Sequence, residues 1–390
     1  METTRRGFLK DAALAAAAVP VIDGVAWGAA SGTSIASQAS PAAPRSATPS
    51  PWVDGLSFLG PIDEVAASGL SALILDVTAV ERLPTTDGSI KYFRSFEACA
   101  RSITQHRRNL ASGAIPGAFL ATKGSEIAGA HASGRTAVFF QFQGCEPIGD
   151  DLSRLELFYE LGLRVLQITH HNNNAWGGGA IEKTWTGLTK TGIEGVERMN
   201  AIGLIPDLSH VSEPTSLDVL RVSRRPVIVS HTAARAIVNN ARCTTDAVIR
   251  GVAKSGGVTG IFMMSFWLTT DARPTVDHVV AQLRHVIDVG GIDAVGIAND
   301  YPIGGEANAR KVNNDNAEAI TGYLEWWRAV GREGVLGFDR VPTHVVVPEL
   351  NHPRRMFDIH AALERARFSS TDIEKIMGGN WTRLLSDTLG

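Results

Sequence analysis

Short apolar runs alternate with amphipathic stretches along the chain from Trp52 onward. The apolar runs span residues 71–77, 136–142, 164–169, 203–208, 226–230, 257–263 and 294–298, and the amphipathic stretches span residues 97–110, 151–161, 192–202, 212–221, 244–255 and 275–289. Because buried parallel strands alternate with covering helices in this way, the pattern predicts an α/β fold. The order favours a single TIM-like (β/α)8 barrel over a doubly wound sheet, followed by a C-terminal helical extension over residues 356–389.

The first 51 residues differ in composition from the rest and are expected to lie outside the barrel. Arg5 and Arg6 precede Phe8 and an Ala-rich apolar stretch, which indicates a twin-arginine export signal over residues 1–30. An amphipathic helix with an incidental Arg pair is the alternative. Residues 31–51, rich in Ala, Ser, Pro and Thr, are typical of a disordered linker. We therefore expect a barrel domain over residues 52–390, exported folded to the periplasm or secreted.

Charge and composition exclude several classes of partner. The chain has 37 basic and 40 acidic residues and a net charge of −3, whereas a nucleic-acid-binding surface normally brings an excess of Lys and Arg. The N-terminal apolar stretch is too short to cross a bilayer, so no membrane span is expected. No glycine-rich fingerprint follows a predicted strand, which argues against nucleotide binding. These observations favour a small-molecule substrate.

Polar side chains stand at the carboxyl ends of the predicted strands. Two apolar runs end in the same dipeptide, Ser209-His210 and Ser230-His231, and the other strand ends carry Gln141, Gln143, His170, His171, Asn299 and Asp300. Since strands of a barrel deliver their carboxyl ends to one face, these side chains predict a shared pocket. Imidazole is the commonest metal ligand, and a carboxylate completes such a shell or accepts a proton. A metal centre and an acid–base site without metal both remain open.

Arg242 follows His231 by eleven residues, in a predicted loop above the same face. Its planar guanidinium suits the carboxylate of a substrate. A solvated loop arginine is the alternative.

Several segments, taken together, resemble the membrane (renal) dipeptidase family, zinc peptidases on an amidohydrolase-type barrel. They are residues 166–176, 187–192, 203–212, 226–234, Arg242, 294–300 and 378–383. The resemblance implies that His210 and His231 bind a zinc ion and that Arg242 holds the carboxylate of a dipeptide. It also implies that His170 binds the substrate and polarises its scissile carbonyl. Asp300 would move a proton from the attacking water to the leaving amine, and the protein would form a homodimer.

Three metal ligands of the family pattern are replaced. The family's opening Asp-Gly-His-Asn-Asp aligns with residues 54–58, so Leu56 and Phe58 stand in place of a His and an Asp. The Glu that bridges two ions aligns with Gln143, whose carbonyl oxygen is at most a weak ligand. We therefore expect a site reduced to one zinc ion, or to none.

Three functions follow from this mixture of retained and replaced residues. The first is an exported metal-dependent hydrolase that cleaves the amide bond of a dipeptide or a similar small carboxylate-bearing amide. The second is a catalytically degenerate relative that binds a small peptide-like ligand. The third is altered, non-hydrolytic chemistry in the same pocket. The retained His170, Arg242 and Asp300 favour the first.

Overall fold

The structure, a computed structural model, describes residues 48–59, 62–84, 90–305 and 320–390. The expected export signal (1–30) and most of the expected linker (31–51) lie outside these ranges. The strands are β1 (Val53–Phe58), β2 (Ala72–Asp76), β3 (Glu81–Pro84), β4 (Ile90–Phe93), β5 (Ala118–Leu120), β6 (Thr136–Phe142), β7 (Leu163–Gln167), β8 (Ile205–Asp207), β9 (Val229–Thr232), β10 (Thr259–Ile261), β11 (Val295–Ile297) and β12 (Tyr301–Pro302). The helices are α2 (Ile62–Ala67), α3 (Phe96–Ala111), α4 (Glu126–Ala132), α5 (Arg154–Glu160), α6 (Lys190–Ile202), α7 (Glu213–Val222), α8 (Asp246–Lys254), α9 (Ser265–Leu268), α10 (Val276–Gly290), α12 (Thr321–Arg332), α13 (Arg355–Arg365), α14 (Ser370–Glu374) and α15 (Asn380–Leu389).

The parallel strands follow one another in chain order. One sheet runs β12-β1-β2-β6-β7-β8 and a second runs β11-β10-β9. Hydrogen bonds join the two sheets beside β8, because Leu208 N donates to Ile228 O at 2.8 Å and Ile228 N donates to Pro206 O at 3.0 Å. On the other side β12, which follows β11 along the chain, pairs with β1. The predicted α/β fold is confirmed, and hydrogen bonds link its strands in the order that a barrel requires.

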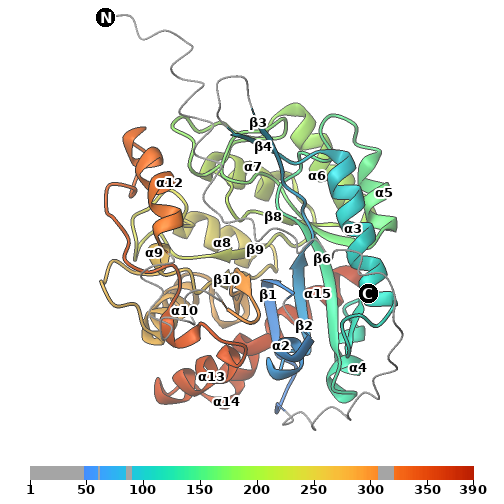
Figure 1. Cartoon of the computed structure of the whole chain (residues 1–390), viewed down its shortest axis with the longest axis vertical. Coiled ribbons are helices and arrows are strands. Elements are labelled where there is room, and N and C mark those ends of the chain that lie inside the picture. The colour runs from blue at the N-terminus through green and yellow to red at the C-terminus, as the bar shows by residue number, and fades with distance from the viewer. Residues whose placement is uncertain (1–47, 60–61, 85–89, 306–319) are drawn as a thin grey trace, which may run out of the picture.

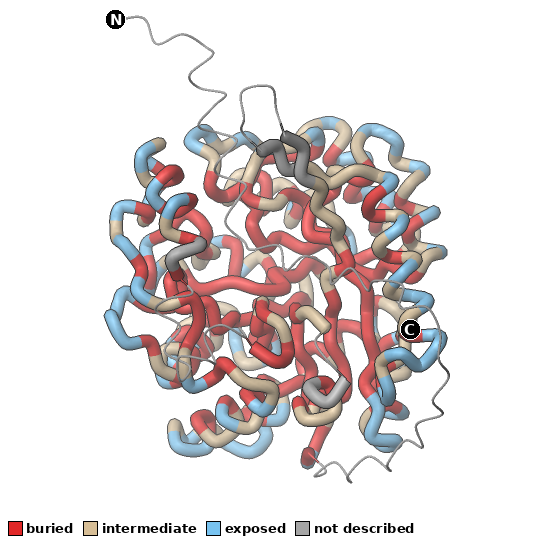
Figure 2. Tube along the Cα trace, in the orientation of Figure 1, coloured by how far each residue is buried: buried red, intermediate tan, exposed pale blue. Residues whose placement is uncertain are grey.

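The two faces of the strands pack into two apolar cores. The larger core lies between the strands and the surrounding helices, which Figure 1 shows on both sides of the strands. Figure 2 shows buried residues running through the central strands and exposed residues on the outer helices. The smaller core contains Val53, Ile74, Phe139, Val165 and further apolar residues of the same strand faces. Such continuous burial on both faces is typical of parallel strands.

The last helix of the predicted C-terminal extension, α15, is part of this smaller core, whereas α13 packs in the larger one. Trp381 on α15 is fully buried, and its indole N–H donates to Ile297 O at 3.0 Å. Gly55 on β1 and Gly296 on β11 leave room for the indole ring, since a Cβ on either would lie 2.3 Å from it. Helix α15 therefore covers the amino-terminal ends of the strands.

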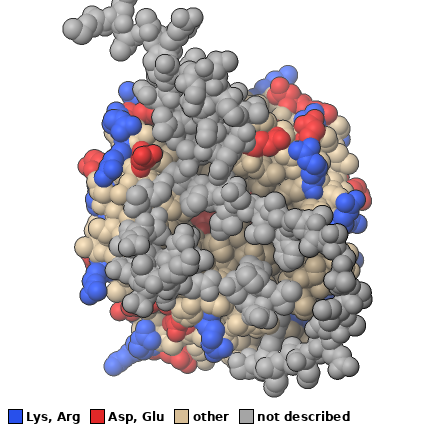
Figure 3. Space-filling view, viewed as in Figure 1, with Lys and Arg blue, Asp and Glu red and all other residues tan. Residues whose placement is uncertain are grey.

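Two surface properties bear on possible partners. Within the described ranges, none of the helices combines the length and the apolar character that crossing a bilayer needs. Figure 3 shows acidic and basic side chains interspersed around the edge of one face rather than separated by sign.

Candidate metal centre and active site

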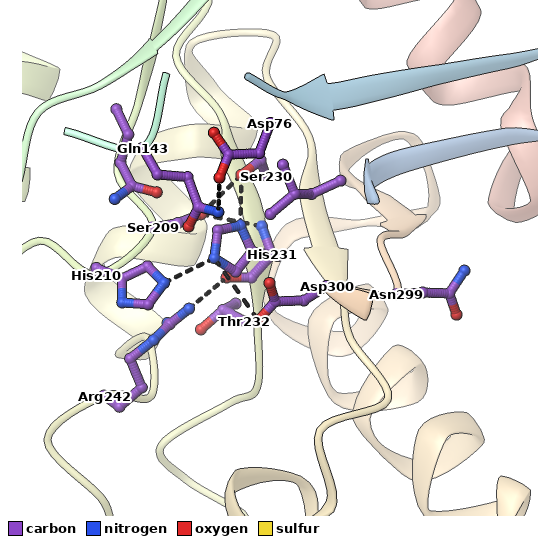
Figure 4. A network of polar contacts seen from close by, with 12 residues as sticks. Asp76, Gln143, Ser209, His210, Ser230, His231, Thr232, Arg242, Asn299 and Asp300 are labelled. Carbon is purple, nitrogen blue, oxygen red and sulfur yellow. Dashed lines mark hydrogen bonds and ion pairs between the residues drawn. The ribbon is translucent and has the colours of Figure 1, made fainter. Parts of the chain in front are cut away.

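The predicted site residues meet at the carboxyl ends of the strands. His170 follows β7, His210 follows β8, His231 lies in β9, and Asp300 lies between β11 and β12. Figure 4 shows His210, His231, Arg242 and Asp300 close together. Nε2 of His231 lies 2.8 Å from Nε2 of His210 and 3.9 Å from Oδ2 of Asp300. Three segments that are distant in sequence thus bring atoms of His210 and Asp300 close to His231.

The backbone turns sharply at three of these strand ends. His171, His210 and Asp300 have φ values of 65°, 64° and 55°, and Arg367 is the other non-glycine residue in the described ranges with positive φ. This left-handed conformation is unfavourable for side chains with a Cβ and is concentrated at functional sites. The conformation supports assigning a functional role to this cluster.

A buried carboxylate orients the ring of His231. Asp207 accepts hydrogen bonds from the backbone N and Oγ of both Ser209 and Ser230 at 2.6 to 2.9 Å, and from Nε2 of Gln141 at 2.8 Å. Burial raises the pKa of Asp207, and the bonds from Ser230 and Ser209 oppose that rise. Ser230 Oγ lies 2.8 Å from Nδ1 of His231. Because Ser230 donates to Asp207, it accepts from His231, which leaves Nε2 of His231 with a free lone pair.

The imidazoles are held neutral. Burial lowers the pKa of His170, His171, His210 and His231 well below the usual 6.5, and the nearby Arg242 cation adds to the effect. A neutral imidazole has the lone pair that a metal ligand needs. Burial also raises the pKa of Asp300 from 3.8 to about 7, although Arg242 opposes this shift. Asp300 can therefore exchange a proton near neutral pH.

Arg242 is buried beside this cluster rather than solvated, so the solvated-loop alternative is wrong. The residue is 2% exposed, and its guanidinium carbon lies 5.4 Å from the ring centre of Trp267 and 5.5 Å from that of Phe262. Nη2 donates to His231 O at 3.2 Å, while Nε and Nη1 have no hydrogen-bond partner among the residues that the structure describes. Burial lowers the pKa of Arg242 to about 10, so it remains a cation at neutral pH. A buried cation with free N–H donors suits an anionic ligand.

The positions of the replaced ligands are apolar or occupied. Leu56 is fully buried in β1, and Phe58 ends that strand. Nε2 of Gln143 donates to Oδ2 of Asp76 at 2.8 Å, and the backbone N of Gln143 donates to Thr78 Oγ1 at 2.7 Å. Gln143 therefore has only Oε1 left for a cation.

Some residues of the site were not predicted from the sequence. Asp76 ends an apolar run in the same manner as the predicted site residues, so the strand-end criterion could have found it. Asp207 stands two residues before Ser209, but its contacts with Ser230 and Gln141 depend on which strands are neighbours. The sequence places His171 at a strand end without indicating a role for it, and the structure places its Nδ1 3.1 Å from Nδ1 of His210.

The imidazoles of His210 and His231 can share one metal ion. Two nitrogen ligands at about 2.0–2.1 Å from a tetrahedral zinc lie about 3.3 Å apart, so the 2.8 Å between the Nε2 atoms of His210 and His231 needs an adjustment of about half an ångström. A carboxylate oxygen, Oδ2 of Asp300, lies 3.9 Å from Nε2 of His231. Two imidazoles, with a carboxylate 3.9 Å from one of them, supply part of the ligand set of a catalytic zinc, and ligand atoms of His170, His171 and His210 also lie within 4.8 Å of one another.

Comparison with known proteins identifies the family. A family model described as membrane dipeptidase (Peptidase family M19) matches residues 114–315. The chain belongs to the membrane dipeptidase family. The matched segment contains His170, His210, His231, Arg242 and Asp300, whereas Leu56 and Phe58 precede it.

Relatives of the chain are found among sequences and solved structures. Dipeptidase tcpJ from Claviceps purpurea (strain 20.1) is 30% identical over 274 residues, which are 69% of this chain and 55% of that protein. The chain spans about half the length of the curated relatives it matches. An amidohydrolase from Pseudomonas aeruginosa superposes with a TM-score of 0.68 at 23% identity, covering 87% of this chain and 97% of that one. A metallo peptidase from Rhodobacter sphaeroides, liganded with a phosphinate mimic of the dipeptide L-Ala-D-Ala, has a TM-score of 0.68 at 19% identity and 87% and 99% coverage. These two structures share the fold.

Proposed function

We propose that this chain is an exported, metal-dependent hydrolase that cleaves the amide bond of a dipeptide or a similar small carboxylate-bearing amide. The observation that carries the proposal is that Nε2 of His231 lies 2.8 Å from Nε2 of His210 and 3.9 Å from Oδ2 of Asp300, with the buried Arg242 cation beside them. We further propose that the site holds one zinc ion, because Leu56 and Phe58 replace ligands of the other ion of the family pattern and Gln143 replaces the Glu that both ions share. The twin-arginine pattern of residues 1–30 supports export, and the family resemblance supports a homodimer.

His210 and His231 would hold the ion, which would supply Lewis acidity toward the carbonyl and a more acidic water. Arg242 would bind the carboxylate of the substrate in a buried setting, where the attraction between charges is stronger than in water. His170, whose ring centre lies 4.3 Å from that of His210, would donate a hydrogen bond to the carbonyl oxygen as it gains negative charge. Asp300, with its pKa near 7, would pass a proton from water to the leaving amine.

Metal content and turnover, measured on the same samples, test this proposal. The purified chain is loaded with zinc, dialysed, analysed for metal and assayed against a panel of dipeptides. We expect about one equivalent of zinc and measurable hydrolysis, and we expect both to be lost in His210→Ala. His285→Ala is the matched control, because His285 contacts Asp246 on α8 rather than the site. Hydrolysis that persists without bound metal would refute a metal-dependent hydrolase.

Other outcomes separate the two remaining functions. Stoichiometric zinc without turnover of any dipeptide would favour altered chemistry in the same pocket. Absence of both zinc and turnover, with retained binding of a dipeptide in calorimetry, would favour a degenerate relative that binds a ligand through Arg242.

A further inference from the structure

The ring of His210 has an imidazole neighbour at each of its two nitrogen atoms. Its Nε2 atom lies 2.8 Å from Nε2 of His231, and its Nδ1 atom lies 3.1 Å from Nδ1 of His171. His170 completes a group of three, because one ligand atom from each of His170, His171 and His210 lies within 4.8 Å of the other two. The ring centre of His170 lies 4.4 Å from that of His171 and 4.3 Å from that of His210. The proposed mechanism has no role for His171 and does not explain this group.

The spacing within this group is close to that of metal ligands. Two nitrogen ligands of a tetrahedral zinc lie about 3.3 Å apart, at about 2.0–2.1 Å from the ion. The 3.1 Å between the Nδ1 atoms of His171 and His210 is nearer to this value than the 2.8 Å between His210 and His231. His170 is half-buried, whereas His171 and His210 are buried, so its side chain is the one with room to move. An adjustment of at most about 1.5 Å brings its nitrogen to the ligand spacing.

We propose that His170, His171 and His210 form a second position for a divalent transition-metal ion such as Zn²⁺. Imidazole suits zinc, copper, nickel and iron, whereas Mg²⁺ and Ca²⁺ prefer oxygen ligands, so the three side chains select the class of ion. The second position shares His210 with the position beside His231. Because a neutral imidazole offers one lone pair, His210 serves one position at a time, and the chain holds one ion. This inference goes beyond the proposed function, since it needs neither His231 nor hydrolysis.

Neighbouring charges determine which position the ion prefers. Oδ2 of Asp300 lies 3.9 Å from Nε2 of His231, so the position beside His231 has a carboxylate close to it. The three imidazoles of the second position supply no negative charge, and the buried Arg242 cation opposes any further cation in this region. We therefore expect the wild type to hold its ion beside His231 and the second position to fill when His231 is removed. An ion there is not expected to support hydrolysis, because the proposed proton carrier Asp300 lies beside the other position.

Zinc binding by the full chain with His231→Ala tests the inference. The variant is titrated with zinc in calorimetry, and X-ray absorption of the loaded sample counts the imidazole ligands. We expect about one equivalent of zinc, bound about tenfold or more weakly than by the wild type, with three imidazoles at about 2.0–2.1 Å. Adding His171→Asn should abolish this binding, and Asn tolerates the left-handed backbone at that position. Adding His285→Ala instead is the matched control, since His285 contacts Asp246 on α8, and it should leave the binding unchanged.

Two results would overturn the inference: a folded His231→Ala variant that binds no zinc, or zinc retained after His171→Asn is added. Circular dichroism establishes that each variant is folded. His231→Phe is measured beside His231→Ala, because it keeps a planar ring without nitrogen and replaces the alanine variant if that variant unfolds. The outcome is separable from the proposed function. Zinc bound by His231→Ala, without dipeptide turnover by the zinc-loaded wild type, would refute only the proposed function, and turnover by the wild type with a metal-free His231→Ala would refute only the second position.

Discussion

Gln143→Glu would restore the carboxylate of the family pattern, yet we expect it to destabilise the zinc-free protein. Nε2 of Gln143 lies 2.8 Å from Oδ2 of Asp76, so the new carboxylate would face an existing one. Two such charges repel by about 6 kcal/mol at an effective dielectric constant of about 20. The pair can avoid this repulsion by binding a proton. Keeping a carboxyl group with an ordinary pKa of about 4.3 protonated costs about 1.4 kcal/mol for each pH unit above that pKa, which amounts to about 4 kcal/mol at pH 7. We expect the free energy of unfolding to fall by about 4 kcal/mol at pH 7.

The pH dependence identifies the cause of this loss. The pKa of the carboxylate pair is raised in the folded state, so the native variant holds a proton that the unfolded chain has released above pH 4. The loss in the free energy of unfolding, relative to the wild type, should vanish near pH 4 and grow by about 1.4 kcal/mol per pH unit up to pH 7. Urea unfolding of the zinc-free variant and wild type at several pH values between 5 and 7 measures it. An equal penalty at pH 5 and pH 7 would refute the electrostatic reasoning.

A double variant separates charge from packing. Asp76→Asn combined with Gln143→Glu exchanges the two side-chain types and leaves a single carboxylate, with the amide as its donor. We expect its stability to lie within about 1 kcal/mol of the wild type at pH 7. If the double variant is as unstable as Gln143→Glu alone, the cost arises from packing.

Three further changes test other parts of the structure. Asp300→Asn should raise the stability of the zinc-free protein at pH 8 but not at pH 4, because burial raises the pKa of Asp300 to about 7 and the folded state resists its ionisation; urea unfolding at both pH values checks this, and equal effects would contradict it. Arg242→Lys should raise KM for dipeptides about 10- to 100-fold, since an ammonium replaces the planar guanidinium, while zinc content stays unchanged. Initial-rate kinetics and metal analysis of the variant and the wild type measure both quantities. Trp381→Ala should lower the free energy of unfolding by about 3–5 kcal/mol, because it empties a fully buried site; a loss below about 1 kcal/mol in urea unfolding would argue against its packing role.

The strands that carry the site were largely predictable from local sequence. The apolar run 136–142 coincides with β6, and the ends of β8 and β9 place His210 and His231 at one face as expected. Apolar composition and the polar residue that ends a strand are local properties, so a single sequence contains them. Strand β1 was not predicted from periodicity, because Asp54, Gly55 and Ser57 interrupt its apolar pattern. Their partners are remote, as the 2.7 Å bond from Asn299 Nδ2 to Oδ2 of Asp54 illustrates.

The hydrogen-bonded interior of the site was less accessible to sequence reasoning. The bonds that Ser230 donates to Asp207 and Gln143 donates to Asp76 connect different strand ends. Each depends on strand order, register and side-chain rotamer, which no local pattern encodes. The burial of Arg242 likewise arises from Trp267 and Phe262, which come later in the chain.

The position of Trp381 has a consequence for the order of events during synthesis. Gly55 on β1 is among the first residues of the described fold to be made, yet the indole that packs against it belongs to the last helix. At about 5–20 residues per second, roughly 15–65 seconds separate their emergence. During that interval the interior face of the early strands lacks its closing helix, and apolar side chains such as Val53 and Phe139 need protection from aggregation. The smaller core is therefore expected to be completed only after α15 has left the ribosome. A chain that stops before this helix would lack the indole that fills the core.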